Sequence, residues 1–176
     1  ELAAFTMPVE GQQLKWWMDR YNQVASFGFM IRDSSRGSVR YPLKHELPWI
    51  RYHMEKEDLR LMIRGMVFLG RVFFAAGAKK VMLPLNQENN VFDSLESLEK
   101  ADFSSLKPIH LHMMAFHPLG TCGMGRVVDE NLMLCPGVYV CDGSVVPESL
   151  GVNPQITIYA FALRLADHLL GKNQFS

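Results

Sequence analysis

The segment from His117 to Gly125 constrains the fold of this chain more than any other part of its sequence. It reads HPLGTCGMG and places Gly120, Gly123 and Gly125 within six residues. Because glycine adopts backbone conformations that other residues resist, such a segment turns tightly and lets its main chain approach another group closely. We therefore expect a compact loop after His117, with a backbone against which a flat ligand can lie.

A second string follows at the end of a predicted strand. Residues 138–141 form a short apolar run, and Asp142-Gly143-Ser144 leaves it as a turn. In an open sheet, the ends of the strands are where ligand-facing groups gather. An aspartate in a turn also commonly hydrogen-bonds its own backbone, so Asp142 fits either a ligand-binding or a turn-forming role.

A third string, residues 151–155 (GVNPQ), stands at the start of the last helical pattern. Asn153 before Pro154 is typical of a helix N-cap followed by the first helical position. Residues 156–170 continue with apolar residues at helical spacing until Gly171. The start of this helix would aim unpaired backbone N–H groups and a partial positive charge outward, which suits a negatively charged group.

Together these three strings resemble the C-terminal signature of the glucose-methanol-choline (GMC) oxidoreductases. The resemblance implies a flavoenzyme that oxidises an alcohol to a carbonyl, with FAD as its cofactor. In that family the histidine and the later asparagine face the reactive edge of FAD, which gives the catalytic roles to His117 and Asn153. The resemblance also implies that the turn at Asp142 and Gly143 lies beside the phosphate and ribityl chain of FAD.

The same resemblance implies that the start of the last helix binds the flavin ring. Asn153, Pro154 and Gln155 would lie near the flavin C2 carbonyl, where negative charge builds during reduction. Proline has no N–H, so Gln155 would be the hydrogen-bond donor. A histidine can accept the substrate hydroxyl proton near neutral pH, while a neutral amide holds the oxygen. His117 would therefore be the base, and Asn153 would position the alcohol.

The resemblance is strongest over residues 117–170 and looser over residues 8–116. Residues 32–39 (RDSSRGSV) are similar to a stretch of the long-chain alcohol oxidase branch, and cholesterol oxidase-like enzymes are the other related branch. Together with the apolar composition, this favours a small lipophilic alcohol or sterol as the substrate. The chain departs from the family at Gly123, where arginine is usual, and over residues 132–137, which replace a more polar turn.

The sequence contains no GxGxxG turn between a strand and a helix, which is the motif that holds the pyrophosphate of a dinucleotide. GMC enzymes carry that motif at their N-terminus, and this chain begins at Glu1 rather than methionine. We therefore interpret the chain as roughly the C-terminal third of a larger enzyme, whose N-terminal FAD-binding region is its partner. Residues 1–117 would form most of a substrate-binding domain, and residues 118–176 would complete the FAD-binding domain.

The remaining patterns predict an α+β fold, in which helices cover an antiparallel sheet. Apolar residues at three- and four-residue spacing indicate a helix over residues 8–24. Residues 58–78 are strongly apolar and indicate a buried helix, which Gly77 in a left-handed conformation would end. Residues 86–106 are polar and indicate an exposed excursion with one short helix.

The strands of this sheet are predicted from alternation and turn residues. Residues 27–32 and 38–41 are expected to pair as a hairpin around a polar turn, and residues 49–54 to form another short strand. Residues 109–116 alternate between two faces and predict a strand that ends at His117.

Two alternatives to the flavoenzyme remain open. In the predicted strand 109–116, His110 and His112 share a face, as metal ligands on a strand do, and His117 or Cys122 would be the third ligand of a metal-dependent enzyme. That pattern has no carboxylate at a suitable spacing, and we assign no metal site. The other alternative is a non-catalytic interaction module with the same fold, which predicts a complete gene without the glycine motif.

The overall composition limits the possible partners and compartment. The balance of 18 basic against 18 acidic residues gives no reason to expect nucleic acid. Three cysteines without metal-type spacing favour a reducing compartment, and we expect the cytoplasm. Arg64 and Arg71 interrupt the apolar segment 58–78 too often for a bilayer crossing, which leaves only an interfacial membrane contact open.

Overall fold

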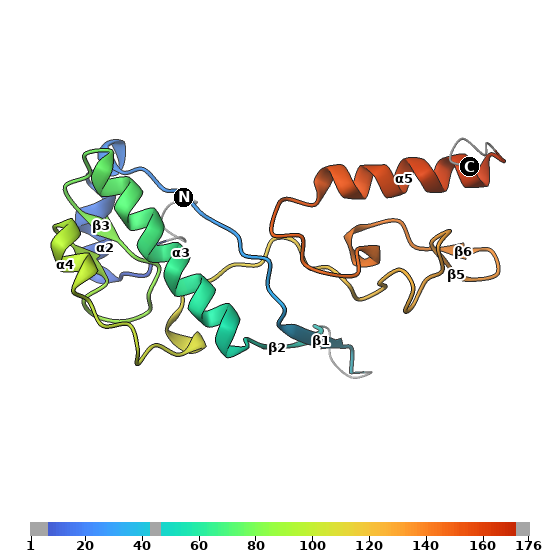
Figure 1. The fold of residues 1–176 in the computed structure, drawn as a ribbon, viewed down its shortest axis with the longest axis horizontal. Coiled ribbons are helices and arrows are strands. Elements are labelled where there is room, and N and C mark those ends of the chain that lie inside the picture. Colours follow the sequence, from blue (N-terminus) through green and yellow to red (C-terminus); the bar gives the residue numbers. More distant parts are fainter. Residues whose placement is uncertain (1–6, 43–46, 172–176) are drawn as a thin grey trace. The chain divides into compact units, whose positions relative to one another are not determined.

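The fold, seen in a computed structural model, consists of helices and short antiparallel strand pairs, described for residues 7–42 and 47–171 (Figure 1). The predicted α+β class is confirmed. Two compact units are present: Glu1–Phe29 with Lys56–Met114, and Met30–Glu55 with Ala115–Ser176. The assignment of residues 1–117 and 118–176 to substrate and FAD domains stays a prediction.

The first unit is built on its longest helix, α3 (Lys56–Ala75), close to the range predicted from the sequence. Glu57 and Asp58 lie in its first turn, where their charge complements the helix dipole. Gly77 follows with a φ of +92°, the left-handed conformation expected at the end of a helix. Within the described residues, no helix is both long enough and apolar enough to cross a membrane.

The core of the first unit lies where α3 meets β3 (Val81–Met82) and α4 (Leu95–Glu99), and β4 (Val91–Phe92) packs beside both of these. Leu98 of α4 is fully buried, with 1% of its surface exposed. A Cβ atom at Gly70 of α3 would lie only 2.7 Å from Leu98 Cδ2. The missing side chain at Gly70 therefore makes room for Leu98, and the two helices pack closely at this point.

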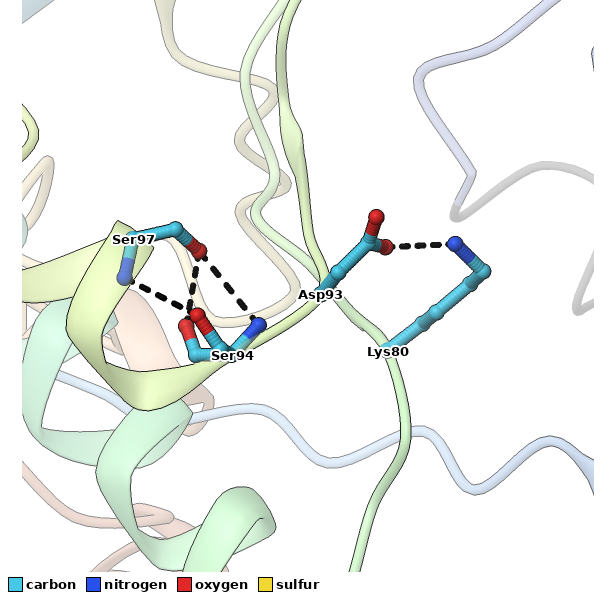
Figure 2. Close-up of polar contacts among 4 residues, drawn as sticks. All are labelled: Lys80, Asp93, Ser94 and Ser97. Carbon is cyan, nitrogen blue, oxygen red and sulfur yellow. Dashed lines mark hydrogen bonds and ion pairs between the residues drawn. The ribbon is translucent and has the colours of Figure 1, made fainter.

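Figure 2 shows the start of α4, the short helix predicted within the exposed excursion. Ser94 Oγ accepts a hydrogen bond from the Ser97 N–H at 3.1 Å, and Ser97 Oγ accepts one from the Ser94 N–H at 3.3 Å. This reciprocal capping box satisfies two backbone donors at the helix end. Just before the helix, Asp93 forms an ion pair with Lys80 (Figure 2).

The helix predicted over residues 8–24 forms as two shorter pieces, α2 (Gly11–Met18) and the 3₁₀ turn η1 (Tyr21–Gln23). Arg20 interrupts the helix, with φ −115° and ψ 21°. Trp17 and Met18 are partly buried as the pattern predicted, whereas Tyr21 is 58% exposed.

The predicted strand over residues 109–116 is wrong. Pro108 begins a 3₁₀ turn, η2 (Pro108–His110), because proline cannot donate to a strand ladder but is tolerated at the start of a helical turn. Leu111 then forms a single antiparallel bridge with Leu85. The alternating sequence continues towards His117, and no strand among the described residues pairs with it.

In the second unit, β1 (Arg36–Arg40) pairs with β2 (Trp49–His53) in an antiparallel register that places Val39 opposite Ile50. The strand expected at residues 49–54 is confirmed, but the hairpin between residues 27–32 and 38–41 is wrong. The segment treated as its turn instead supplies the start of β1.

Gly37 shows why this segment is a strand rather than a turn. A Cβ atom at Gly37 would lie 2.5 Å from the carbonyl oxygen of Arg51. The glycine is thus needed because the partner strand approaches closely, which is a recognised reason for glycine within a strand.

The rest of the second unit packs around helix α5 (Gln155–Leu169). The strand predicted over residues 138–141 is shorter than expected: β6 (Val138–Tyr139) pairs with β5 (Met133–Cys135). The core under the helix consists of four buried residues: Val128, Leu132, Val145 and Leu165.

We expect replacement of Leu98 by alanine to lower the free energy of unfolding by about 2 to 5 kcal/mol, because it removes buried side-chain atoms and leaves a cavity against α3. Leu95, in the same helix and 40% exposed, provides the matched control. Its replacement by alanine should cost less than about 1 kcal/mol. Denaturant unfolding measures both values, and equal losses would contradict this packing.

Candidate active site

The structure brings together the two residues predicted to be catalytic. His117 Nε2 lies 3.0 Å from Asn153 Oδ1, across 36 positions of sequence. An amide oxygen can only accept a hydrogen bond, so His117 Nε2 is the donor here in the tautomer that carries its hydrogen on Nε2. The amide nitrogen of Asn153 keeps two N–H groups for another acceptor. Both side chains are exposed, and both belong to the second unit.

The loop after His117 has the tight turns that its glycines predict. Gly120 and Gly125 have φ of +85° and +77°, in the left-handed region. The Cys122 N–H donates to the Ser144 carbonyl at 3.0 Å. These features hold the loop against the chain that follows Asp142.

Asp142 and Gly143 occupy the turn predicted to bind the cofactor. Asp142 Oδ1 accepts a hydrogen bond from the Ser144 N–H at 2.8 Å and caps the 3₁₀ turn η3 (Gly143–Val145). This is the local role that an aspartate in a turn commonly has. A Cβ atom at Gly143 would lie 3.4 Å from Leu119 Cδ2, so this glycine lies directly against the loop that carries His117.

The start of α5 differs from the prediction by one residue. The N-cap is Pro154, and no side chain caps the helix. Asn153 was predicted to be the N-cap, but its side chain hydrogen-bonds His117 instead. Gln155 is therefore the first helical residue, and the N–H groups of the first turn, which have no partner within a helix, remain available to a ligand.

The segment that leads to Asn153 is held by contacts that the sequence did not predict. The Arg126 guanidinium donates to the Pro147 carbonyl, and Arg32 forms an ion pair with Glu148 at 3.5 Å. Charge and spacing gave no signal for either arginine, because both partners are distant in sequence.

Gly151, two residues before Asn153, is constrained in two ways. Its φ is +70°, and a Cβ atom there would lie 2.9 Å from Arg32 Cβ and 3.2 Å from the Arg32 backbone nitrogen. Gly151 is the first residue of the third string, GVNPQ, and this was the sequence signal for its contact with Arg32. The glycine lets the chain turn and pass close to the Arg32 main chain.

The histidines of the metal alternative have other roles. His110 Nδ1 accepts a hydrogen bond from the Lys107 N–H at 3.2 Å, and His112 Nδ1 lies 3.3 Å from Asn86 Oδ1. In the part of the chain that the structure describes, no group of three or more His, Cys, Asp or Glu side chains is placed to hold a metal ion. The strand that would have aligned these two histidines is also not formed.

The family model for GMC oxidoreductase matches residues 33–162. The chain belongs to the GMC oxidoreductase family. This membership confirms the resemblance inferred from the three strings.

Curated relatives agree with this assignment. An uncharacterized GMC-type oxidoreductase of Mycobacterium tuberculosis is 33% identical over 97% of this chain and 28% of its own length. Another, from Sinorhizobium fredii, is 31% identical over 87% of this chain and 32% of its own length. A long-chain-alcohol oxidase of Arabidopsis thaliana is 26% identical over 94% of this chain and 24% of its own length. The chain thus spans about a third or less of these relatives, and no solved structure matches it.

We expect Gly151→Ala to lower the free energy of unfolding by about 2 to 5 kcal/mol, since it combines a left-handed alanine with a clash against the Arg32 main chain. Gly125 is the matched control, because it has a similar φ but no other atom within 4 Å of where a Cβ would lie. Gly125→Ala should cost only about 1 to 2 kcal/mol. Denaturant unfolding compares the two, and equal losses would argue against the close contact.

Proposed function

We propose that this GMC oxidoreductase oxidises an alcohol to a carbonyl with FAD as its cofactor. The observation that carries the proposal is the hydrogen bond between His117 and Asn153, made directly before an α5 N-terminus that no side chain caps. An imidazole can accept the proton of the substrate hydroxyl, and a neutral amide can donate a hydrogen bond to its oxygen. Both groups must lie within hydrogen-bonding distance of that one hydroxyl. The pair supplies both groups.

The start of α5 fits a flavin ring whose negative charge increases on reduction. Its first-turn N–H groups and the positive end of the helix dipole favour an anionic neighbour. Pro154 offers no donor, so the N–H of Gln155 is the first that could bind the C2 carbonyl. The turn at Asp142 and Gly143 is the proposed neighbour of the phosphate and ribityl chain. Gly143 has no side chain, and it lies directly against the loop that carries His117.

In the proposed reaction, the alcohol hydroxyl replaces the hydrogen bond between His117 and Asn153. The His117 ring in its other tautomer accepts the hydroxyl proton at Nε2, while an Asn153 N–H donates to the substrate oxygen and holds the carbon in place. FAD, when bound, accepts the hydride from that carbon. The proton and the hydride together account for the two hydrogens lost when an alcohol becomes a carbonyl.

We further propose a lipophilic alcohol as the substrate. A relative named as a long-chain-alcohol oxidase aligns with 94% of this chain, which supports that class. The reducing, cytoplasmic compartment stays a prediction; in the structure Cys122, Cys135 and Cys141 are free.

The proposed partner is the remainder of a longer polypeptide that supplies the pyrophosphate-binding motif. Helix α5 supports this proposal, because it is apolar on two sides. Leu165 faces the core of the second unit, whereas Ile156 and Leu163 are 82% and 67% exposed. Large exposed apolar side chains beside one another mark contact surfaces, so this outer side of α5 is the proposed contact with that remainder.

We expect His117→Ala to slow flavin reduction by about 10²- to 10⁴-fold, because it removes the general base. The experiment is an anaerobic titration of the protein expressed from its complete gene with medium- and long-chain alcohols, followed by the visible flavin band. His112→Ala removes a second histidine that also contacts an asparagine, and it should leave the rate unchanged. A complete gene product that binds no flavin, or a His117→Ala variant that bleaches at the normal rate, would exclude the proposal.

The partner proposal is tested by one substitution in two contexts. Leu163→Asp should change the stability of this chain alone by less than about 0.5 kcal/mol, since the side chain is largely exposed. In the complete gene product the same change should cost at least about 2 kcal/mol, because a buried leucine contact is lost. Thermal or denaturant unfolding gives both values, and a small cost in both contexts would remove α5 from the interface.

A further inference from the structure

Two consecutive turns fold Arg126 back over the loop that follows His117. The Gly123 N–H donates to the Gly120 carbonyl at 3.2 Å, and the Arg126 N–H donates to the Gly123 carbonyl at 3.0 Å. The Arg126 side chain therefore returns towards residues that precede it, instead of extending away from the loop.

The guanidinium fills the space that the glycines leave. A Cβ atom added at Gly123 would lie 3.0 Å from Arg126 Nη2, and one added at Gly120 would lie 3.7 Å from it. From there Nη2 donates to the Pro147 carbonyl. Because Gly123 is buried and has no side chain, the planar guanidinium can lie against its backbone.

This hydrogen bond joins the two chain segments that carry the candidate catalytic pair. His117 begins the loop beneath the guanidinium, and Pro147 begins the segment that ends at Asn153 six residues later. The Met124 N–H donates to the Val145 carbonyl at 2.9 Å and fixes the same two segments on the other side of the turn. Arg126 supplies a side-chain link between the His117 loop and the segment that leads to Asn153.

We propose that Arg126 is a positioning residue, which holds the His117 loop on the Pro147 carbonyl and so keeps His117 and Asn153 at hydrogen-bonding distance. This inference rests on the proposed function, since it assigns Arg126 to the same pair. A guanidinium presents its donors in a rigid plane, whereas a lysine offers one flexible ammonium group. Lysine should therefore restore the link only in part.

The test uses the protein expressed from its complete gene, with Arg126→Met, Arg126→Lys and the control Arg40→Met. Arg40 lies on the exposed strand β1 of the same unit. Arg126→Met should lower kcat for alcohol oxidation by about 10- to 100-fold with little change in KM, because misplaced reacting groups cost rate rather than binding. Arg126→Lys should recover part of kcat, and Arg40→Met should leave it unchanged.

A second readout does not depend on turnover. Selective ¹⁵N-histidine labelling reports the His117 tautomer, and the wild-type protein should show the hydrogen on Nε2. Arg126→Met should shift or lose that signal, whereas Arg40→Met should not. If alcohols fail to reduce the flavin of the wild-type protein, the proposed function fails, and the tautomer signal alone decides the role of Arg126.

A purely structural Arg126 would give a different result. In that case kcat per flavin-bound molecule and the His117 signal would both stay at wild-type values, and the positioning role would be overturned. If Arg126→Met does not fold, Arg126→Gln replaces it, because the shorter polar side chain removes the guanidinium that donates to the Pro147 carbonyl. An unchanged kcat and an unchanged His117 signal in Arg126→Gln would overturn the proposal equally.

Discussion

The arrangement of the second unit depends on the backbone pairing between the glycine-rich loop and the chain after Asp142. The N–H groups of Cys122 and Met124 donate to the carbonyls of Ser144 and Val145, and these bonds need glycines on either side that turn in the left-handed region. Val145, at this junction, is fully buried beneath α5. The same few hydrogen bonds therefore hold the loop in place and position both the core and the start of α5. His117 and Asn153 are exposed, and their side chains meet because these backbone hydrogen bonds hold the two segments that carry them.

The sequence singled out two candidate residues that the structure brings together, but it did not reveal the contacts that position them. His117 and Asn153 were selected by residue type, spacing and resemblance, and the structure places them together. The role of Asn153 as a helix cap was a local inference, and it failed because a distant histidine competed for the same amide. Arg126 and Arg32 were missed for a related reason: their partners are a carbonyl and a carboxylate far along the chain, which no local pattern reveals.

The errors in secondary structure have the same origin. Alternation over residues 109–116 indicates a strand only if a second strand is available, and the described part of the chain offers nothing beyond the single bridge of Leu111. Gly37 looked like a turn residue because glycine is common in turns, but a close partner strand needs it as well. By contrast, α3 was predicted almost correctly, because a long apolar helix with a C-terminal glycine contains its signals within itself.

Each compact unit is assembled from two separate stretches of chain, and this has a consequence for the order of synthesis. The hairpin of β1 and β2 leaves the ribosome about 60 residues before the chain reaches Ala115, where the rest of its unit begins. At ordinary translation rates that interval lasts roughly 3 to 12 s. A two-stranded ribbon is marginally stable in water by itself. For that time its arginine- and aromatic-rich strands are synthesised without the stretch of chain that completes their unit.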